Sequence, residues 1–200
     1  ADILGGIAAL HGWGQAARAL ADCSGVVPTI TIVTGPAVSG PALLIGLADF
    51  VIMTKESYAF VSGPTMVAEF TGVAISHDEL GGTDAHAKHS GVASLVVDDF
   101  DGAKAALEHL LTYLPNNVDE VATPISSGDP SDRSLMDVFR IIPDSTTGSY
   151  DVRDVIRSIA DDGDLLELRG RWAPNVDLLE LRGRWAPNVV TAFTTIAGMP

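Results

Sequence analysis

Apolar residues along the chain fall in short β-branched runs that are separated by segments with helical spacing. The runs at residues 29–34, 50–53, 58–61 and 92–97 have the length and composition of strands. Helices are predicted between them at residues 42–45 and 65–70, and Ser76 and Glu79 form a capping box for a short helix that ends at Gly81-Gly82. Strands that alternate with helices place the chain in the α/β class.

Three longer helices are predicted outside this region. In residues 1–24 small apolar residues recur at helical spacing, broken by Gly12 and Gly14. Residues 98–114 carry one apolar face, and Pro115 stops the helix. That face consists of Ala103, Ala106, Leu107, Leu110, Leu111 and Leu114. Residues 150–160 restart a helical pattern.

The domain organisation follows from a change in composition. Residues 116–149 are rich in Pro, Asp, Ser, Thr and Gly, which is typical of a linker. We predict that residues 1–123 are the C-terminal part of one domain, that residues 124–149 link it to a second, and that residues 150–200 begin the second.

The C-terminal part contains an exact repeat. Residues 164–176 read DLLELRGRWAPNV, and residues 177–189 read the same thirteen letters. A natural repeat array needs about three units, and its units drift in sequence. Two explanations stay open, an artefact of how the sequence was assembled and a recent tandem duplication.

Composition and charge exclude several classes of partner. Twelve basic residues against 26 acidic ones give a net charge of −14, which argues against a nucleic-acid partner. No apolar run reaches the roughly 20 residues of a membrane helix, so no membrane partner is predicted. The single cysteine, Cys23, fits a reducing, cytoplasmic compartment. The first residues contain neither Met nor a secretory signal, and we expect a chain that is entered midway.

The strand–turn–helix at residues 29–45 is the sharpest chemical signal. A turn of small residues that leads into a helix presents unpaired backbone N–H groups, which stabilise a developing oxyanion without a titratable side chain. Ser39 and Gly40 are the predicted donors, since Pro41 has no N–H. The spacing Ser-Gly-Pro recurs at Ser62-Gly63-Pro64, where Gly63 could shape a pocket.

Other reactive groups carry weaker signals. Asp84, His86 and His89 lie in a Gly-flanked segment and are more typical of solvated or capping groups, so no metal site is predicted. The pairs Asp78-Glu79 and Asp119-Glu120 point apart on a helix and make poor acid–base pairs. Arg18, Lys55 and Lys88 could meet phosphates, or be ordinary surface charges. His11 and His109 have no partner that the sequence reveals.

Several long blocks carry a resemblance to a known family. They read GPAVSGPALLIGLADFVIMT, FVSGPTMVAEFTGVAISHDELGGTDAHAKHSGVASLVVDD and LLTYLPNN, followed by YDVRDVI, DDGDLLEL and WAPNVVTAF. Together they resemble the carboxyltransferase (beta) subunits of biotin-dependent acyl-CoA carboxylases of the propionyl-CoA type. Deleting one copy of the repeat restores the spacing of that family.

The resemblance implies a crotonase-type fold, in which ββα units stack into a superhelix. It implies transfer of a carboxyl group from carboxybiotin to the α-carbon of an acyl-CoA in fatty acid metabolism, as a ligase or transferase. Biotin would arrive on a biotin carboxylase or biotin carrier partner, and subunits would form a hexamer. In the family, two consecutive glycines form the oxyanion hole, and these positions correspond to Ser39 and Gly40 here. The first glycine is thus replaced by Ser39. The resemblance also implies that Pro41, Ala42 and Gly63 lie beside the substrate.

Two alternatives accompany this interpretation. One is another acyl-CoA enzyme of the crotonase fold, such as a hydratase, isomerase or decarboxylase, although the required acid–base carboxylate has no obvious candidate after the Ser39-Gly40 turn. The other is a non-catalytic assembly module. The resemblance also implies that the second oxyanion hole, for the biotin ureido oxygen, lies beyond Pro200, so the fragment alone should not turn over.

Overall fold

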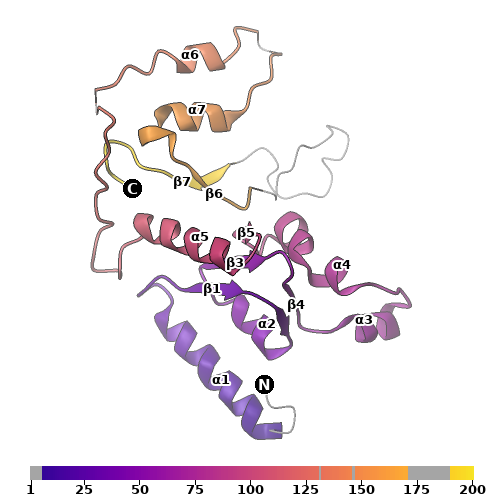
Figure 1. Cartoon of the computed structure of the whole chain (residues 1–200). Helices are drawn as coiled ribbons and strands as arrows, with labels where there is room; N and C mark the ends of the chain where they lie inside the picture. The colour runs from indigo at the N-terminus through magenta and orange to yellow at the C-terminus, as the bar shows by residue number, and fades with distance from the viewer. Residues whose placement is uncertain (1–5, 131, 146, 171–189) are drawn as a thin grey trace.

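Sixteen elements are assigned in the computed structural model, which describes residues 6–130, 132–145, 147–170 and 190–200 (Figure 1). The first half contains α1 (Gly6–Cys23), β1 (Ile30–Val33), β2 (Pro36–Val38), α2 (Gly40–Ile45), β3 (Phe50–Thr54), β4 (Tyr58–Phe60), α3 (Pro64–Thr71), α4 (His77–Gly81) and the π-helix η2 (Ala85–Ser90). The second half contains β5 (Leu95–Val97), α5 (Phe100–Tyr113), α6 (Val138–Ile141), α7 (Val152–Ile159), the 3₁₀ helix η3 (Asp161–Gly163), β6 (Leu166–Leu168) and β7 (Thr191–Phe193).

The first half of the chain forms two parallel sheets. One has the order β1-β3-β5, and the other pairs β2 with β4. The sequence β1-β2-α2 is followed by β3-β4-α3, so in each unit the first strand joins one sheet and the second strand joins the other. This repeated ββα unit confirms the predicted α/β class.

The segment at Pro36 differs from expectation. A turn was predicted at Gly35-Pro36, but Pro36 begins β2, which pairs with β4 in the register Pro36↔Tyr58. A proline is tolerated at the first position of a strand, where its missing N–H is not needed for the ladder. The chain changes sheet at this point, and β2 ends directly before the Ser39-Gly40 turn.

The core has two parts. One lies around the two sheets and consists of Val33, Ala37, Ile45, Val51, Met53, Ala59, Ala87 and Ala93. The other packs Leu110 and Tyr113 of α5 against Leu166 of β6. Helix α5 therefore lies between the β1-β3-β5 sheet and the antiparallel pair of β6 and β7 (Figure 1).

Two predicted helices differ from the structure in detail. Helix α1 runs without a break through Gly12 and Gly14, because a glycine weakens a helix by about 1 kcal/mol but does not interrupt its hydrogen bonds. On α5, Leu111 is 50% exposed although it was placed on the buried face, and Tyr113 is buried instead. Tyr113 is held there by stacking on Phe193, with 5.6 Å between the ring centroids.

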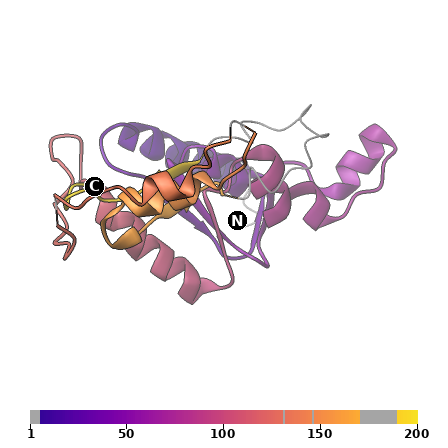
Figure 2. The ribbon, with the colours of Figure 1, turned by 90° about the horizontal axis from the view of Figure 1, so that it is seen from above.

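Helices α3 and α4 form an arm that projects from the body (Figures 1 and 2). No residue of α3 is buried, and the apolar side chains of Met66 and Phe70 are exposed. The capping box of α4 is confirmed, since the Ser76 hydroxyl accepts from the Glu79 N–H at 3.2 Å and the Ser76 N–H donates to the Glu79 carboxylate at 2.9 Å. The backbone and hydroxyl hydrogen bonds from Ser76 lower the pKa of Glu79.

Residues 124–149 contain only α6 as regular structure in their described part, and the linker assigned to them stays a prediction. The second copy of the thirteen-residue repeat, and the first copy from residue 171 onward, lie outside the described residues. Within the part that the structure describes, no helix is both long and apolar enough to cross a membrane.

Candidate active site

The two Ser-Gly-Pro turns lie at the same end of the small parallel sheet. The first turn, Ser39-Gly40-Pro41, follows β2 and leads into α2, and the second turn, Ser62-Gly63-Pro64, follows β4 and leads into α3. Because β2 and β4 are parallel neighbours with Val38 opposite Phe60, the turns leave adjacent strand ends. The structure thus brings together the residues that the sequence singled out at both turns.

Ser39 adopts a backbone conformation that L-residues avoid, with φ 64° and ψ −116°. Its N–H donates to the carbonyl of Phe60 at 3.0 Å, and its own carbonyl accepts from the N–H of Leu43 at 3.2 Å, as the first bond of α2. The Ser39 side chain makes no capping hydrogen bond. A ligand at the turn would therefore share the Ser39 N–H with Phe60.

Gly40 lies directly against an aromatic ring. A Cβ atom at this position would be 2.9 Å from two atoms of the Trp13 indole, which belongs to α1. No acceptor for the Gly40 N–H is present among the described residues. The first turn of a helix leaves such N–H groups available to a bound anion or oxyanion. The close packing explains why residue 40 is a glycine, and the backbone leaves one N–H of the predicted pair unshared.

An open groove lies beside the second turn. It is lined by Pro64, Thr65, Ala68, Glu69, Ala74 and Ile75 and has a volume of about 510 Å³. Its lining is mainly small and apolar, and it follows the arm formed by α3 and the residues after it. The predicted role of Gly63 in shaping a substrate pocket remains a prediction; the nearest neighbour of a Cβ there would be the Phe60 ring at 3.6 Å.

The histidines of the Gly-flanked segment have different surroundings. The His86 Nε2 lies 2.7 Å from the carbonyl oxygen of Ala59, and its Nδ1 lies 2.8 Å from the Ser90 hydroxyl. Asp84 accepts from the Lys88 ammonium at 2.7 Å, and His89 is exposed. In the described part of the chain, no three His, Cys, Asp or Glu side chains are arranged to hold a metal ion.

The sequence of the whole chain matches one family model. Residues 1–200 match the carboxyl transferase domain. The chain belongs to the carboxyl transferase family.

Relatives of the carboxyl transferase chain are much longer than it is. It is 37% identical to the methylmalonyl-CoA carboxyltransferase 12S subunit of Propionibacterium freudenreichii subsp. shermanii, over 96% of the chain and 34% of that protein. It is 33% identical to the propionyl-CoA carboxylase carboxyltransferase subunit of Haloferax mediterranei, over 86% of the chain and 33% of that protein. It is also 33% identical to the methylmalonyl-CoA decarboxylase subunit alpha of Veillonella parvula, over 84% of the chain and 33% of that protein. The chain thus spans about a third of the curated relatives that it matches.

Solved structures agree with this family. A transcarboxylase 12S crystal structure, with methylmalonyl-coenzyme A and methylmalonic acid bound in a hexamer assembly, superposes with a TM-score of 0.88 at 36% identity, over 100% of this chain and 36% of that one. A long-chain acyl-CoA carboxylase structure at 24% identity, with a TM-score of 0.66, shows the same fold. The family resemblance and the crotonase-like fold predicted from the sequence are confirmed.

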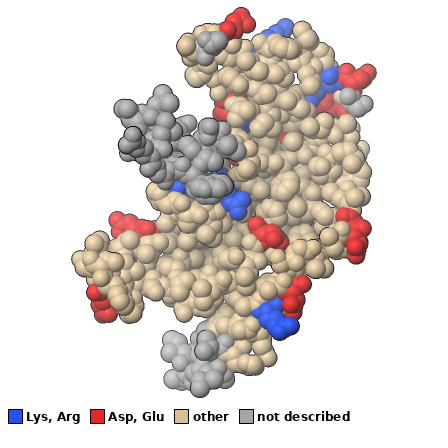
Figure 3. All heavy atoms as spheres, turned by 180° about the vertical axis from the view of Figure 1, so that it is seen from behind, with Lys and Arg blue, Asp and Glu red and all other residues tan. Residues whose placement is uncertain are grey.

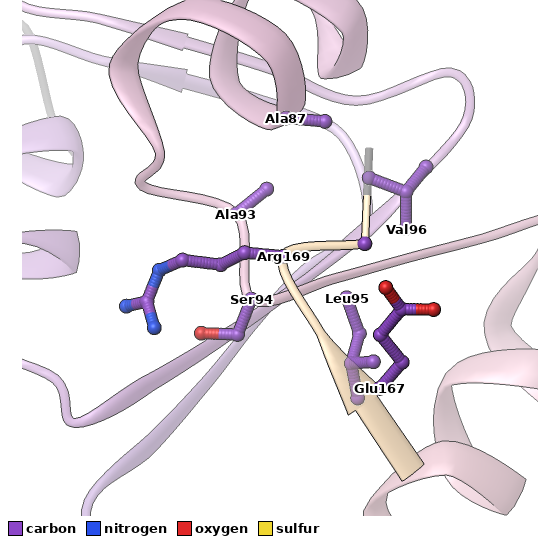
Figure 4. Close-up of a pocket in the computed structure, with 8 residues that line it drawn as sticks. Ala87, Ala93, Ser94, Leu95, Val96, Glu167 and Arg169 are labelled. Atoms are coloured by element: carbon purple, nitrogen blue, oxygen red, sulfur yellow. The ribbon is translucent and has the colours of Figure 1, made fainter. Parts of the chain in front are cut away.

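The carboxyl transferase chain also has a pocket of about 280 Å³ where β6 meets β5 (Figure 4). Glu167 and Arg169 extend to opposite sides of it, and the Arg169 N–H donates to the Ser94 carbonyl at 2.8 Å. Arg153 of α7 holds Glu167 with two hydrogen bonds of 2.8 and 2.6 Å. These hydrogen bonds from Arg153 fix the Glu167 carboxylate.

A second polar cluster joins α5 to Asp164, two residues before β6, and the sequence did not reveal it. The Tyr113 hydroxyl donates to Asp164, and the His109 Nε2 lies 2.9 Å from the same carboxylate oxygen. Burial and the contact with Asp164 raise the pKa of Tyr113. Burial opposes ionisation of Asp164, but hydrogen bonds from Tyr113 and His109 outweigh it and lower the pKa of Asp164. The cluster connects α5 to the segment that leads into β6.

The three basic side chains suggested as phosphate contacts lie in ion pairs. Arg18 pairs with Asp22 at 3.7 Å, Lys88 pairs with Asp84, and Lys55 pairs with Asp98. On the face shown in Figure 3, basic and acidic side chains are scattered over the middle of the face as well as along its rim. The three cations suggested as phosphate contacts therefore each have an acidic neighbour.

Proposed function

We propose that the protein to which this chain belongs moves a carboxyl group between a biotin carrier and the α-carbon of an acyl-CoA. The observation that carries the proposal is the match of the entire chain to the carboxyl transferase domain. The relatives named above are a carboxyltransferase, a carboxylase subunit and a decarboxylase subunit that act on methylmalonyl-CoA or propionyl-CoA. Exchange of a carboxyl group at the α-carbon of a short acyl-CoA is the step that these three activities share.

The first turn supplies the chemistry that this chain contributes. When the α-proton of the acyl-CoA is removed, negative charge develops on the thioester oxygen. The N–H of Gly40 is the principal donor to that oxygen, and the Ser39 N–H is a second donor shared with Phe60. Donors that are fixed before the reaction stabilise the enolate more than the ground-state carbonyl, and this difference lowers the barrier.

The surroundings of the turn fit a thioester. Trp13 packs against Gly40 on the side where a Cβ would lie, but the Gly40 N–H has no acceptor among the described residues, and the Ser39 side chain is exposed. Pro41 and Ala42 in the first turn of α2, and Gly63 in the second turn, would lie beside the acyl group. Carboxybiotin, when bound, supplies the carboxyl group; no residue of this chain is assigned to it.

Assembly and location extend the proposal. One structural relative forms a hexamer, and we propose the same assembly here, with a biotin carboxylase or biotin carrier subunit as partner. In such a hexamer the first turn would face the second domain of a neighbouring subunit. The cytoplasmic location and the ligase role in fatty acid metabolism stay predictions.

The test is a carboxylation assay with the full-length protein. The protein is incubated with radiolabelled bicarbonate, ATP, the cognate biotin carboxylase and carrier, and acetyl-, propionyl- and butyryl-CoA in turn. Incorporation of label into an acyl-CoA is the expected result. If no acyl-CoA is labelled, release of label from preformed [¹⁴C]carboxyl methylmalonyl-CoA is measured with the same carrier. Failure in both directions would leave the assembly module as the better interpretation.

A further inference from the structure

Strand β4 is held from both of its edges by groups that belong to different parts of the chain. Successive carbonyls of an extended strand point to opposite sides. The Phe60 carbonyl accepts from the Ser39 N–H at 3.0 Å, and the Ala59 carbonyl, one residue earlier, lies 2.7 Å from the His86 Nε2. His86 and the first turn therefore hold opposite edges of the same three-residue strand.

The local backbone is built to bring the His86 ring to this edge. Residues Ala85–Ser90 form a π-helix, a rare conformation that is often found at functional sites. Before it, Gly82 forms an isolated antiparallel bridge with Tyr58. A Cβ on Gly81 would lie 2.1 Å from the Ala59 oxygen, so only a glycine lets the chain pass this close.

The hydrogen bonds of the ring determine where its proton lies. A backbone carbonyl can only accept, so the His86 Nε2 must be the donor to Ala59. In the neutral ring Nδ1 then accepts from the Ser90 hydroxyl, at 2.8 Å. Both ring nitrogens are thus occupied, and the imidazole has one orientation. Ala59 itself is 5% exposed, so water has little access to its carbonyl.

We infer that His86 is a positioning residue for the oxyanion turn, acting through Ala59 and Phe60 of β4. His86 fixes the position of β4 from the edge opposite to β2. The Phe60 carbonyl in turn fixes the Ser39 N–H and the direction of the neighbouring Gly40 N–H. Its role in catalysis rests on the proposed carboxyl transfer. Its mechanical role rests only on the contacts described above.

The first test compares variants of the full-length protein in the carboxylation assay. His86→Ala should lower kcat about 10- to 100-fold, because a shift of about 1 Å in a catalytic group has an effect of this size. The KM for the acyl-CoA should stay within about twofold, because the lost interaction acts mainly in the transition state. His86→Gln retains a donor and should recover part of kcat. The matched control is His89→Ala, which changes an exposed histidine of the same π-helix and should leave kcat unchanged.

The second test does not depend on activity. Amide hydrogen exchange of peptides that cover residues 36–41 should be faster in His86→Ala than in His89→Ala, because the Ser39 N–H loses its fixed acceptor. If His86→Ala does not fold, Ser90→Ala is used, which removes the Nδ1 partner together with the longer bond of 3.3 Å that the Ser90 hydroxyl accepts from the Val92 N–H, and which should show the same changes to a smaller extent.

The outcomes separate the two proposals. A folded His86→Ala protein with wild-type kcat, or with unchanged exchange at residues 36–41, overturns the positioning role. A kcat loss that Gln does not relieve, with equal exchange in all variants, also overturns it. A wild-type protein that transfers no carboxyl group overturns the proposed function, while faster exchange in His86→Ala would still support the mechanical link from His86 to the turn.

Discussion

Replacement of Ser39 by glycine should stabilise the protein, although substitutions to glycine usually do the opposite. Ser39 has φ 64° and ψ −116°, a conformation in which a Cβ clashes with the backbone and which glycine adopts freely. A residue in such a sparsely populated region costs about 1–3 kcal/mol. Its side chain makes no capping hydrogen bond and is exposed, so little is lost with it.

The net effect is smaller than the relieved strain. A glycine also increases the conformational freedom of the unfolded chain, which costs about 0.4–1 kcal/mol. The free energy of unfolding should therefore rise by about 0.5–2 kcal/mol in Ser39→Gly. At about 2–4 °C per kcal/mol for a chain of this size, the melting temperature should rise by about 1–8 °C.

Urea denaturation followed by circular dichroism measures this change, and the second turn provides the control. Ser62 occupies the same place in a Ser-Gly-Pro turn, is exposed, and is not among the described non-glycine residues with positive φ. Ser62→Gly should lower the free energy of unfolding by about 0.4–1 kcal/mol. Equal destabilisation by both substitutions would refute the strained conformation of Ser39.

Three further predictions concern packing, pairing and pH. Gly40→Ala should lower the free energy of unfolding by about 1–3 kcal/mol, because the new Cβ meets the Trp13 ring. In a double-mutant cycle with Trp13→Ala, part of this loss should disappear, since the ring is gone. Additive effects of the two substitutions would contradict the contact. Arg153→Met removes both hydrogen bonds to the half-buried Glu167 and should lower the free energy of unfolding by about 1.5–3 kcal/mol, as measured by thermal unfolding. An unchanged free energy of unfolding would contradict the pairing. Backbone hydrogen bonds, foremost from Gly198, lower the pKa of Asp161 in the folded state. The ionised carboxylate therefore stabilises the fold above the unfolded pKa of about 4, and this stability is lost as pH falls through the lower folded pKa. In Asp161→Asn the urea concentration at the unfolding midpoint should fall less steeply as the pH is lowered.

The sequence by itself determined the class of the fold and the place of the first turn. Short β-branched runs predicted β1, β3, β4 and β5, and the capping pair Ser76 and Glu79 predicted the start of α4. These features depend on residues that are close in sequence, so local propensities decide them. The family blocks added the crotonase-like fold, which no local pattern reveals.

Only the tertiary structure decided how the turn is held. Strand β2 could not be predicted from Pro36-Ala37-Val38, because its partner strand lies more than twenty residues away and supplies its hydrogen bonds. The same holds for His86, which the sequence predicted as a solvated or capping group but which contacts Ala59 across 27 residues. It also holds for His109, whose partner Asp164 is 55 residues away.

The chemistry at the turn shows the same division. Small residues before a helix predicted free N–H groups at Ser39 and Gly40, but the positive φ of Ser39 and its bond to Phe60 follow from the pairing of β2 with β4. The sequence shows which hydrogen-bonding groups are present. Which of these groups already have a partner depends on contacts between distant segments, and these contacts exist only in the folded chain.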